Sequence, residues 1–183
     1  TLVREVNQHE YALNQALANA VPEADPDLIA LRTSLQNLYA ERTRRQPLAE
    51  SILQNQVASV AAELGLTFGG QPVPPVLYHV TPPPAALIVS PRHEIRMAHD
   101  ISISPDLGVD EEAALEALVE TNLDVSALVV GIGGIGTYPS MVMQTSNLNW
   151  LVEVVAHEWI HNLLTLRPLG ISYMASAALR TMN

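Results

Sequence analysis

VVAHEWIHNLL, residues 154–164, holds two histidines four positions apart, a glutamate between them and no other charged side chain. Positions i and i+4 lie on the same face of an α-helix, so His157 and His161 would project side by side. A helical pattern begins near Ser146, continues for about five turns and ends at Pro168 and Gly170, which are helix-stop signals. Because the flanking residues are uncharged, we predict a largely buried helix.

The histidine and glutamate side chains of this stretch match the pattern H-E-x-x-H, in which two imidazoles bind one zinc ion. Zinc lowers the pKa of a bound water to about 7, which supplies a nucleophile near neutral pH. Glu158 could then accept a proton from that water and deliver it to the leaving group. In a chain of this composition the pattern arises by chance in roughly 1% of sequences. The motif therefore favours a metal site over two histidines that merely decorate a helix.

This stretch resembles the active-site helix of the zincin metallopeptidases, whose shared feature is the same pentapeptide in uncharged surroundings. The resemblance implies Zn2+ as cofactor, His157 and His161 as its ligands, Glu158 as the catalytic general base, and a peptide or protein substrate. It also implies a small twisted sheet beside the helix, whose edge strand pairs with the extended substrate. We assign Gly134–Met143 to that edge strand, with Gly134 and Tyr138 as substrate-binding residues.

Catalytic zinc takes three protein ligands and a water, yet no His, Asp or Glu follows His161 in this chain. The gluzincin branch of the resembled family takes a glutamate from a following helix. Likeness to that branch implies a glutamate directly after Asn183, which would make this chain truncated at its C-terminal side. Two alternatives stay open: an upstream ligand such as His99, Asp100 or Glu120, or a site that has lost its metal.

The rest of the chain divides by its periodicity. Residues 1–68 form an N-terminal helical region, in which we expect Pro22 and Pro47 to separate three helices. A Gly/Pro-rich connector follows, and residues 76–183 form the zincin-like domain. Its short strands are expected at 76–80, 86–90, 97–104, 126–130 and 135–143, with a helix capped by Asp110 between the third and fourth. Helices followed by short strands and a long helix indicate an α+β fold.

Several other polar groups have weaker claims to a role. Residues 131–136 match G-x-G-x-x-G, but a dinucleotide fingerprint must open a helix, and Pro139 favours extended chain instead. His79 and His99 alternate with apolar residues, as sheet histidines do. Glu153 could orient His157 from one turn away. Tyr138 or Tyr173 could stabilise an oxyanion, as tyrosines do in some zincins.

The composition excludes several classes of function. The sequence has nine basic and nineteen acidic side chains and a formal net charge of −10. It has no stripe of basic residues of the kind that would predict nucleic-acid binding. The absence of cysteine excludes disulfides and thiolate metal sites. No stretch is apolar enough to span a bilayer.

Because the chain begins at Thr1, an upstream signal, anchor or cloning boundary is expected. The compartment stays open, with an extracytoplasmic or membrane-tethered location favoured over the cytoplasm.

Two functions remain after this reading of the sequence. The first is a zinc metallopeptidase that hydrolyses peptide bonds through a metal-activated water, with Glu158 as general base. The second is a non-catalytic binding or scaffold domain that keeps a zincin shape without a working metal site. Substitution of Glu158 by glutamine separates the two, because it removes the general base while leaving both histidines in place.

Overall fold

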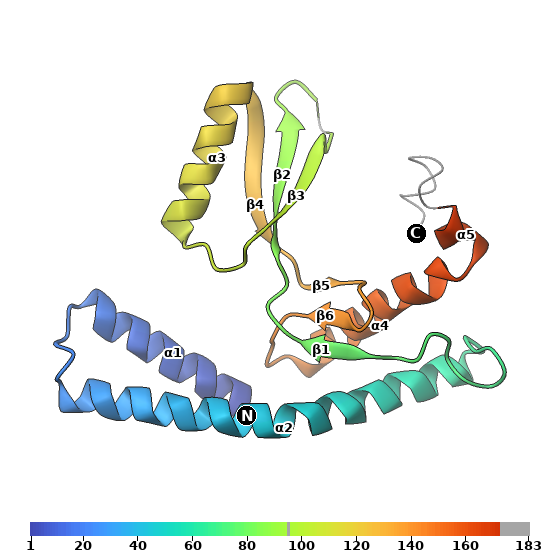
Figure 1. Cartoon of the computed structure of the whole chain (residues 1–183), viewed down its shortest axis with the longest axis horizontal. Helices are drawn as coiled ribbons and strands as arrows, with labels where there is room; N and C mark the ends of the chain where they lie inside the picture. Colours follow the sequence, from blue (N-terminus) through green and yellow to red (C-terminus); the bar gives the residue numbers. More distant parts are fainter. Residues whose placement is uncertain (95, 173–183) are drawn as a thin grey trace.

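The computed structural model describes residues 1–94 and 96–172 and shows an α+β protein with two small sheets. The sheets, β1-β6-β5 and β3-β2-β4, lie one above the other in Figure 1, and the long helix α2 runs beneath both. The predicted α+β class is confirmed. The short strands form two sheets rather than one. Of these, the sheet β1-β6-β5 packs on the helix that carries the H-E-x-x-H sequence.

The N-terminal region is a helical hairpin of two helices rather than three. Helix α1 spans Leu2–Ala18, and α2 runs without a break through Pro26–Glu63. The Asp25 carboxylate caps α2 by accepting hydrogen bonds from the backbone N–H groups of Asp27 and Leu28. The prediction that Pro47 ends a helix was wrong: α2 is bent near its middle but continues (Figure 1). A proline removes one helical hydrogen bond, and tertiary packing on both sides of it offsets that loss.

The first sheet packs against helix α4, Leu148–Thr165, which begins at the Asn147 cap. Its strands are β1 (Tyr78–Val80), β6 (Ser140–Val142) and β5 (Gly134–Ile135), with β1 parallel and β5 antiparallel to the central β6. The prediction of one edge strand over Gly134–Met143 was therefore wrong in extent. Only the short β5 lies at the edge, because residues 136–139 turn the chain back into β6.

Helix α2 contributes to the same core as the first sheet and α4. The buried apolar side chains come from all three: Leu53, Val57 and Ala61 of α2, Val76, Tyr78 and Val142 of the sheet region, and Val155, Trp159 and Leu163 of α4. The predicted N-terminal region and the predicted catalytic domain thus share one core. The indole N–H of Trp159 also donates to the carbonyl of Pro74, which holds the connector against α4.

Side chains of α2 occupy the outer edge of β1. The buried Glu50 carboxylate accepts the backbone N–H of Val80 at 2.8 Å, and the Gln46 amide donates to the carbonyl of Val80 at 2.9 Å. Gln54 donates in the same way to the carbonyl of Tyr78. His79, expected as a sheet histidine, is bonded through Nδ1 to Glu50. These bonds satisfy the unpaired backbone groups of an edge strand, so β1 is closed to further pairing.

The second sheet forms a separate unit with helix α3. Strand β2 (Ala85–Pro91) lies between β3 (His99–Ile103) and β4 (Val125–Gly131), and it is antiparallel to both. Helix α3 (Val109–Leu123) begins at Gly108, whose backbone N–H donates to Glu111, rather than at the predicted cap Asp110. A second, smaller core lies between this helix and the sheet, and its fully buried members are Leu87, Val89 and Ala127.

Helix α4 is followed by the short helix α5, Pro168–Ile171, so the stop signal at Pro168 and Gly170 acts where it was expected. Among the helices that the structure describes, none is both long and apolar enough to cross a membrane.

Candidate metal centre

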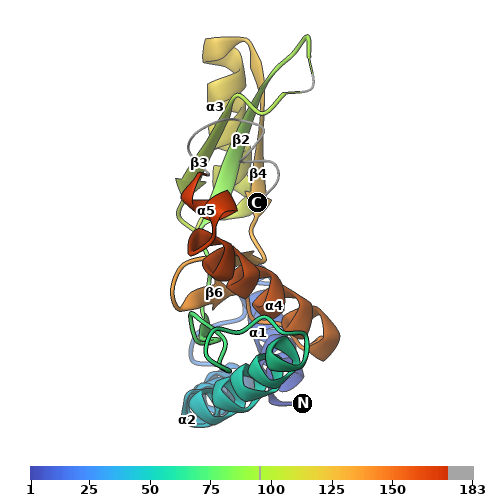
Figure 2. The same cartoon turned by 90° about the vertical axis from the view of Figure 1, so that its right-hand side faces the viewer.

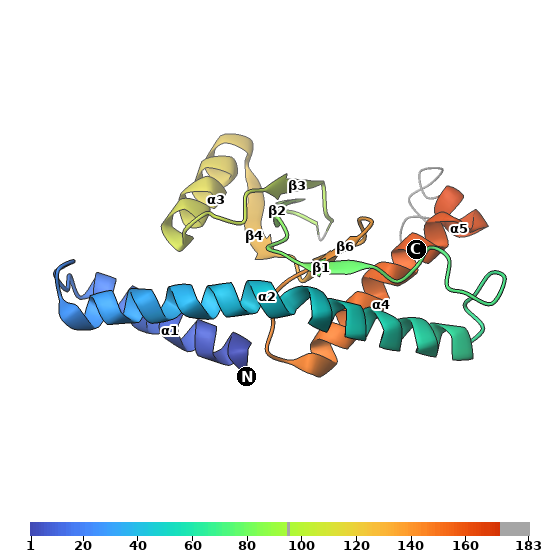
Figure 3. The same ribbon diagram turned by 60° about the horizontal axis from the view of Figure 1, so that its bottom comes forward.

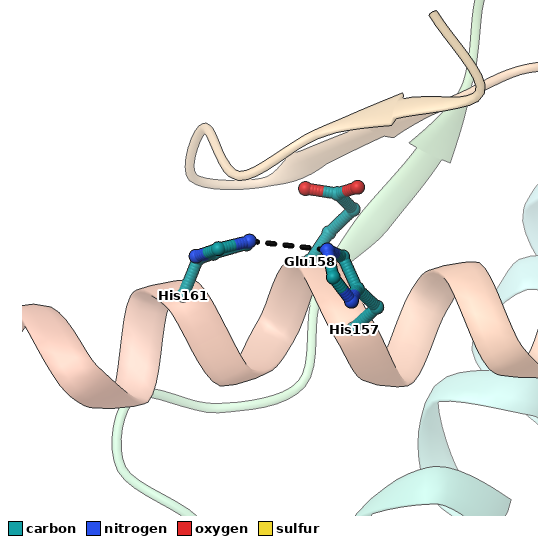
Figure 4. Close-up of side chains that lie close together, drawn as sticks. All are labelled: His157, Glu158 and His161. Carbon is teal, nitrogen blue, oxygen red and sulfur yellow. Dashed lines mark hydrogen bonds between the residues drawn. The ribbon is translucent and has the colours of Figure 1, made fainter. Parts of the chain in front are cut away.

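Helix α4 presents the two histidines on the face turned toward the turn between β5 and β6 (Figure 4). His157 is exposed and His161 is half-buried, whereas Glu158 is only 7% exposed. Figure 4 shows the Glu158 carboxylate pointing from α4 toward the strands, while both imidazoles lie beside it. The three side chains therefore face one small volume, and their candidate ligand atoms lie within 4.8 Å of one another.

The two imidazole rings lie within hydrogen-bond distance of each other. The Nε2 atoms of His157 and His161 are 3.1 Å apart, and the rings meet edge to face at 81°. Two nitrogens bound at 2.0–2.1 Å to a tetrahedral zinc are about 3.3 Å apart. The observed separation is therefore close both to that of two zinc ligands and to that of a hydrogen bond between the rings.

Glu158 is a largely buried side chain whose carboxylate has no hydrogen-bond donor among the described residues. Within residues 1–94 and 96–172 the fully buried side-chain atom that lacks a partner is Arg42 Nε and not an oxygen of Glu158. Burial raises the pKa of Glu158, and the neighbouring charges of His157 and His161 partly oppose that increase. An unpaired carboxylate with a raised pKa beside two imidazoles is typical of a proton-transfer site.

The third ligand was not found in the part of the chain that the structure describes. There the only group of three metal-binding side chains is that of His157, Glu158 and His161. The proposed upstream ligands do not join it: His99 and Asp100 lie on β3 of the second sheet, and the Glu120 carboxylate accepts the backbone N–H of Ala127. The expectation of a glutamate after Asn183 lies outside the described residues.

The glycine-rich run 131–136 brings the chain very close to α4. A Cβ atom on Gly134 would lie 2.7 Å from Val154 Cγ1 and 2.9 Å from Glu158 Cγ, and one on Gly136 would lie 2.9 Å from His161 Cβ. Real Cβ atoms do not approach so closely, so these positions require glycine. The run connects two strands and does not open a helix. Its glycines allow the backbone to lie directly on the face of α4 that carries Glu158 and His161.

The outer edge of β5 carries unpaired backbone groups above this site. The N–H of Met143 donates to the carbonyl of Gly133, and the register then sets Gly134 opposite Val142. Antiparallel pairs alternate between bonded and non-bonded, so the N–H and C=O of Gly134 point away from β6. Within the described residues, these two groups form no backbone hydrogen bond outside the sheet.

Asn162 is the residue of this site that the sequence did not reveal. Its side-chain amide donates to the carbonyl of Thr137 at 2.9 Å and to the hydroxyl of Ser140 at 3.2 Å. It also donates to the carbonyl of Glu158 one turn earlier. These bonds fasten the turn 136–139 to α4 beside His161. The only signal in the sequence was a single polar residue after His161 in an otherwise apolar segment.

Three further residues were predicted to act at this site: Tyr138, Glu153 and Tyr173. The Tyr138 hydroxyl donates to the carbonyl of Pro75 at 3.2 Å, and burial raises its pKa. Glu153 is exposed and forms no hydrogen bond with His157 within the described residues. Tyr173 lies outside the described residues. The roles of Tyr138 and Gly134 in substrate binding remain predictions.

The fold and the site define an α+β protein in which a His-Glu-His cluster on a helix could hold a metal ion. Comparisons of the chain with protein-family models, with curated proteins and with solved structures find no match.

Proposed function

We propose that this protein is a zinc-dependent peptidase, with His157 and His161 as metal ligands and Glu158 as general base. The observation that carries the proposal is the pair of Nε2 atoms 3.1 Å apart beside the largely buried Glu158 side chain. The zincin resemblance of the H-E-x-x-H sequence agrees with this arrangement. A bound zinc ion would supply an acidified water as the nucleophile near neutral pH.

Glu158 would move one proton during peptide hydrolysis. Its carboxylate takes the proton from the attacking water as the water oxygen adds to the peptide carbonyl carbon. When the C–N bond breaks, the same proton passes to the leaving nitrogen. Because no described residue donates a hydrogen bond to this carboxylate, both of its oxygens are available for these transfers.

The edge strand β5 would align the substrate. Strand addition satisfies the backbone of an extended peptide whatever its sequence, and the N–H and C=O of Gly134 provide one such pair of partners beside Glu158. The small twisted sheet on α4 thus supports the zincin-like interpretation of the fold. It favours an extended peptide as the substrate over a compact small molecule.

Within the described residues, His157, Glu158 and His161 form the only group of three metal-binding side chains. Two histidines alone should hold zinc weakly, because catalytic sites use three protein ligands. We therefore expect the protein to take up about one zinc per chain when the ion is in excess, and the variants His157→Ala and His161→Ala to take up none. Elemental mass spectrometry measures the zinc content of all three proteins. A parent protein that takes up no zinc would contradict the proposed centre.

Glu158→Gln is the direct test of the chemistry. Loss of a general base typically costs about 10²–10⁴-fold in rate, so peptide cleavage by the zinc-loaded protein should nearly disappear. Zinc content and the circular dichroism spectrum should not change, since the histidines and the helix are intact. Cleavage of a quenched fluorescent peptide library measures the effect. A variant as active as the parent would exclude Glu158 as the base, and absence of activity in both would favour a binding domain.

A further inference from the structure

Two adjoining cavities separate the helical hairpin from the first sheet, on the side of β1 away from the histidines. Their volumes are about 280 Å³ and about 270 Å³, and four residues line both: Arg42, Gln46, Val80 and Gln144. The larger cavity extends beneath the first turn of α1. Most of its other lining residues are apolar: Leu2, Val3, Ala49, Tyr78 and Leu151.

Arg42 stands at the junction of the two cavities with most of its hydrogen-bonding capacity unused. One guanidinium nitrogen, Nη1, donates to Gln144 Oε1 at 2.6 Å, and the guanidinium lies 5.0 Å from the centre of the Tyr39 ring. Its Nε is buried without a partner. A guanidinium has five N–H donors. Arg42 forms no salt bridge within residues 1–94 and 96–172, whereas Arg44 and Arg45 are both paired with Glu41.

The acidic groups near Arg42 are already bound to other partners. Glu50 lines the larger cavity, but its oxygens accept hydrogen bonds from Val80 N–H and Gln46 and contact His79. Glu10 accepts a hydrogen bond from the hydroxyl of Tyr39, and the Arg42 guanidinium lies over the ring of the same tyrosine. Arg42 is therefore a cation held by a ring and an amide, without a salt bridge among the described residues, although the Glu50 carboxylate lines the same cavity. Such a group matches an incoming carboxylate.

We propose that these cavities bind a medium-chain fatty acid or a similar amphipathic carboxylate. The carboxylate is held by Arg42 at the junction, and the alkyl tail lies in the larger cavity among Leu2, Val3 and Leu151. The apolar lining favours an alkyl chain over a peptide C-terminus, because a peptide backbone would need additional polar partners there. The site is also linked to α1, since the Gln144 side chain bonds both Arg42 and Asn7.

Calorimetric titration of the 183-residue protein with decanoate tests the proposal without reference to zinc or hydrolysis. We expect one saturable site with a Kd on the order of 10–100 µM. 1-Decanol has the tail without the charge and acetate has the charge without the tail, so both should bind at least about tenfold more weakly. No saturable binding of decanoate, or equal binding of decanol, would overturn the proposal. Tighter binding of N-acetyl-Leu-Leu than of decanoate would overturn the assigned ligand class.

Three variants locate the site. Arg42→Gln should weaken decanoate binding at least about tenfold, because it removes the charge. Gln144→Glu should do the same by placing a carboxylate beside Arg42 in a side chain of equal size, which covers the case in which Arg42→Gln fails to fold. Arg44→Gln is the matched control: it changes a cation of the same helix that does not line either cavity. Unchanged affinity in both test variants would contradict the assignment.

Discussion

Glu158, the proposed general base, is a side chain of α4 whose burial should lower the stability of the protein. It is only 7% exposed, burial raises its pKa, and no described residue donates a hydrogen bond to its carboxylate. A group with a raised pKa in the folded state favours folding below its unfolded pKa, and that contribution is lost as the pH rises through the folded pKa. At neutral pH, the ionised Glu158 should therefore destabilise the metal-free protein.

The metal-free Glu158→Gln variant should accordingly be more stable than the parent at pH 7. The difference should vanish at about pH 3, where the carboxyl group of the parent is protonated in both the folded and the unfolded state. Urea unfolding of both proteins in the presence of a chelator, at the two pH values, measures it. A variant that is less stable than the parent at pH 7 would show that the charge is solvated or paired.

Asn162→Ala should release the turn 136–139 from α4. We expect a loss of about 1–2 kcal/mol in the free energy of unfolding, because the bonds to Thr137 and Ser140 disappear. Peptide cleavage should fall while the histidines still bind zinc. Asn55→Ala is the matched control, since the Asn55 amide makes only the equivalent bond to a carbonyl one turn earlier in α2. Equal effects of the two substitutions would show that the tertiary bonds contribute nothing.

At the scale of elements, the contact between β5 and α4 depends on the absence of side chains from the strand. Gly134→Ala should destabilise the protein by about 1–3 kcal/mol, because the new methyl group would overlap Val154 and Glu158. It should also lower peptide cleavage by displacing the general base. Gly131→Ala is the control, since a Cβ there meets nothing within 4 Å. Thermal unfolding and cleavage assays of both variants measure the difference, and a harmless Gly134→Ala would refute the close contact.

Helix α2 contains Pro47 in its interior, where proline is normally costly. Pro47→Ala restores a backbone N–H and improves helix propensity, so the free energy of unfolding should rise by about 1–3 kcal/mol. The decisive comparison is chemical denaturation of parent and variant. A loss of stability would instead show that the bend is needed to bring Gln46 and Glu50 to the edge of β1.

At the scale of the whole molecule, two hydrophobic cores serve two sheets. The larger core joins α2, the first sheet and α4, and the smaller core joins α3 to the second sheet. Figures 2 and 3 show the unit formed by α3 and the second sheet standing away from the α1–α2 hairpin. The candidate metal centre belongs to the unit built on the larger core.

Leu87→Ala in the smaller core should cost about 2–5 kcal/mol, and the loss of hydrogen-exchange protection should be confined to residues 85–131. Val155→Ala, which truncates a fully buried side chain two residues before His157, should reduce protection in α2 and α4 and weaken zinc binding. Hydrogen-exchange mass spectrometry and zinc titration distinguish the two. A global loss of protection in Leu87→Ala would show that the units unfold together.

Local patterns were sufficient to predict the α+β class, the five-turn helix around the H-E-x-x-H sequence and the approximate positions of β1 to β4, but not the division of residues 134–143 into β5 and β6. Apolar periodicity and the i, i+4 spacing of His157 and His161 are properties of short segments, so they can be read without knowledge of distant residues. Their side-by-side placement follows from helix geometry alone. The functional roles of the cluster remain predictions.

Only the tertiary structure decided the pairing of the strands, the course of α2 through Pro47 and the surroundings of Glu158. Strand order depends on contacts between residues far apart in sequence, such as Tyr78 with Ser140, and no local pattern encodes them. The roles of Asn162 and of the glycines at 134 and 136 became visible for the same reason. Each depends on how closely β5 and its turn approach α4, and that distance is set by the packing of the whole core.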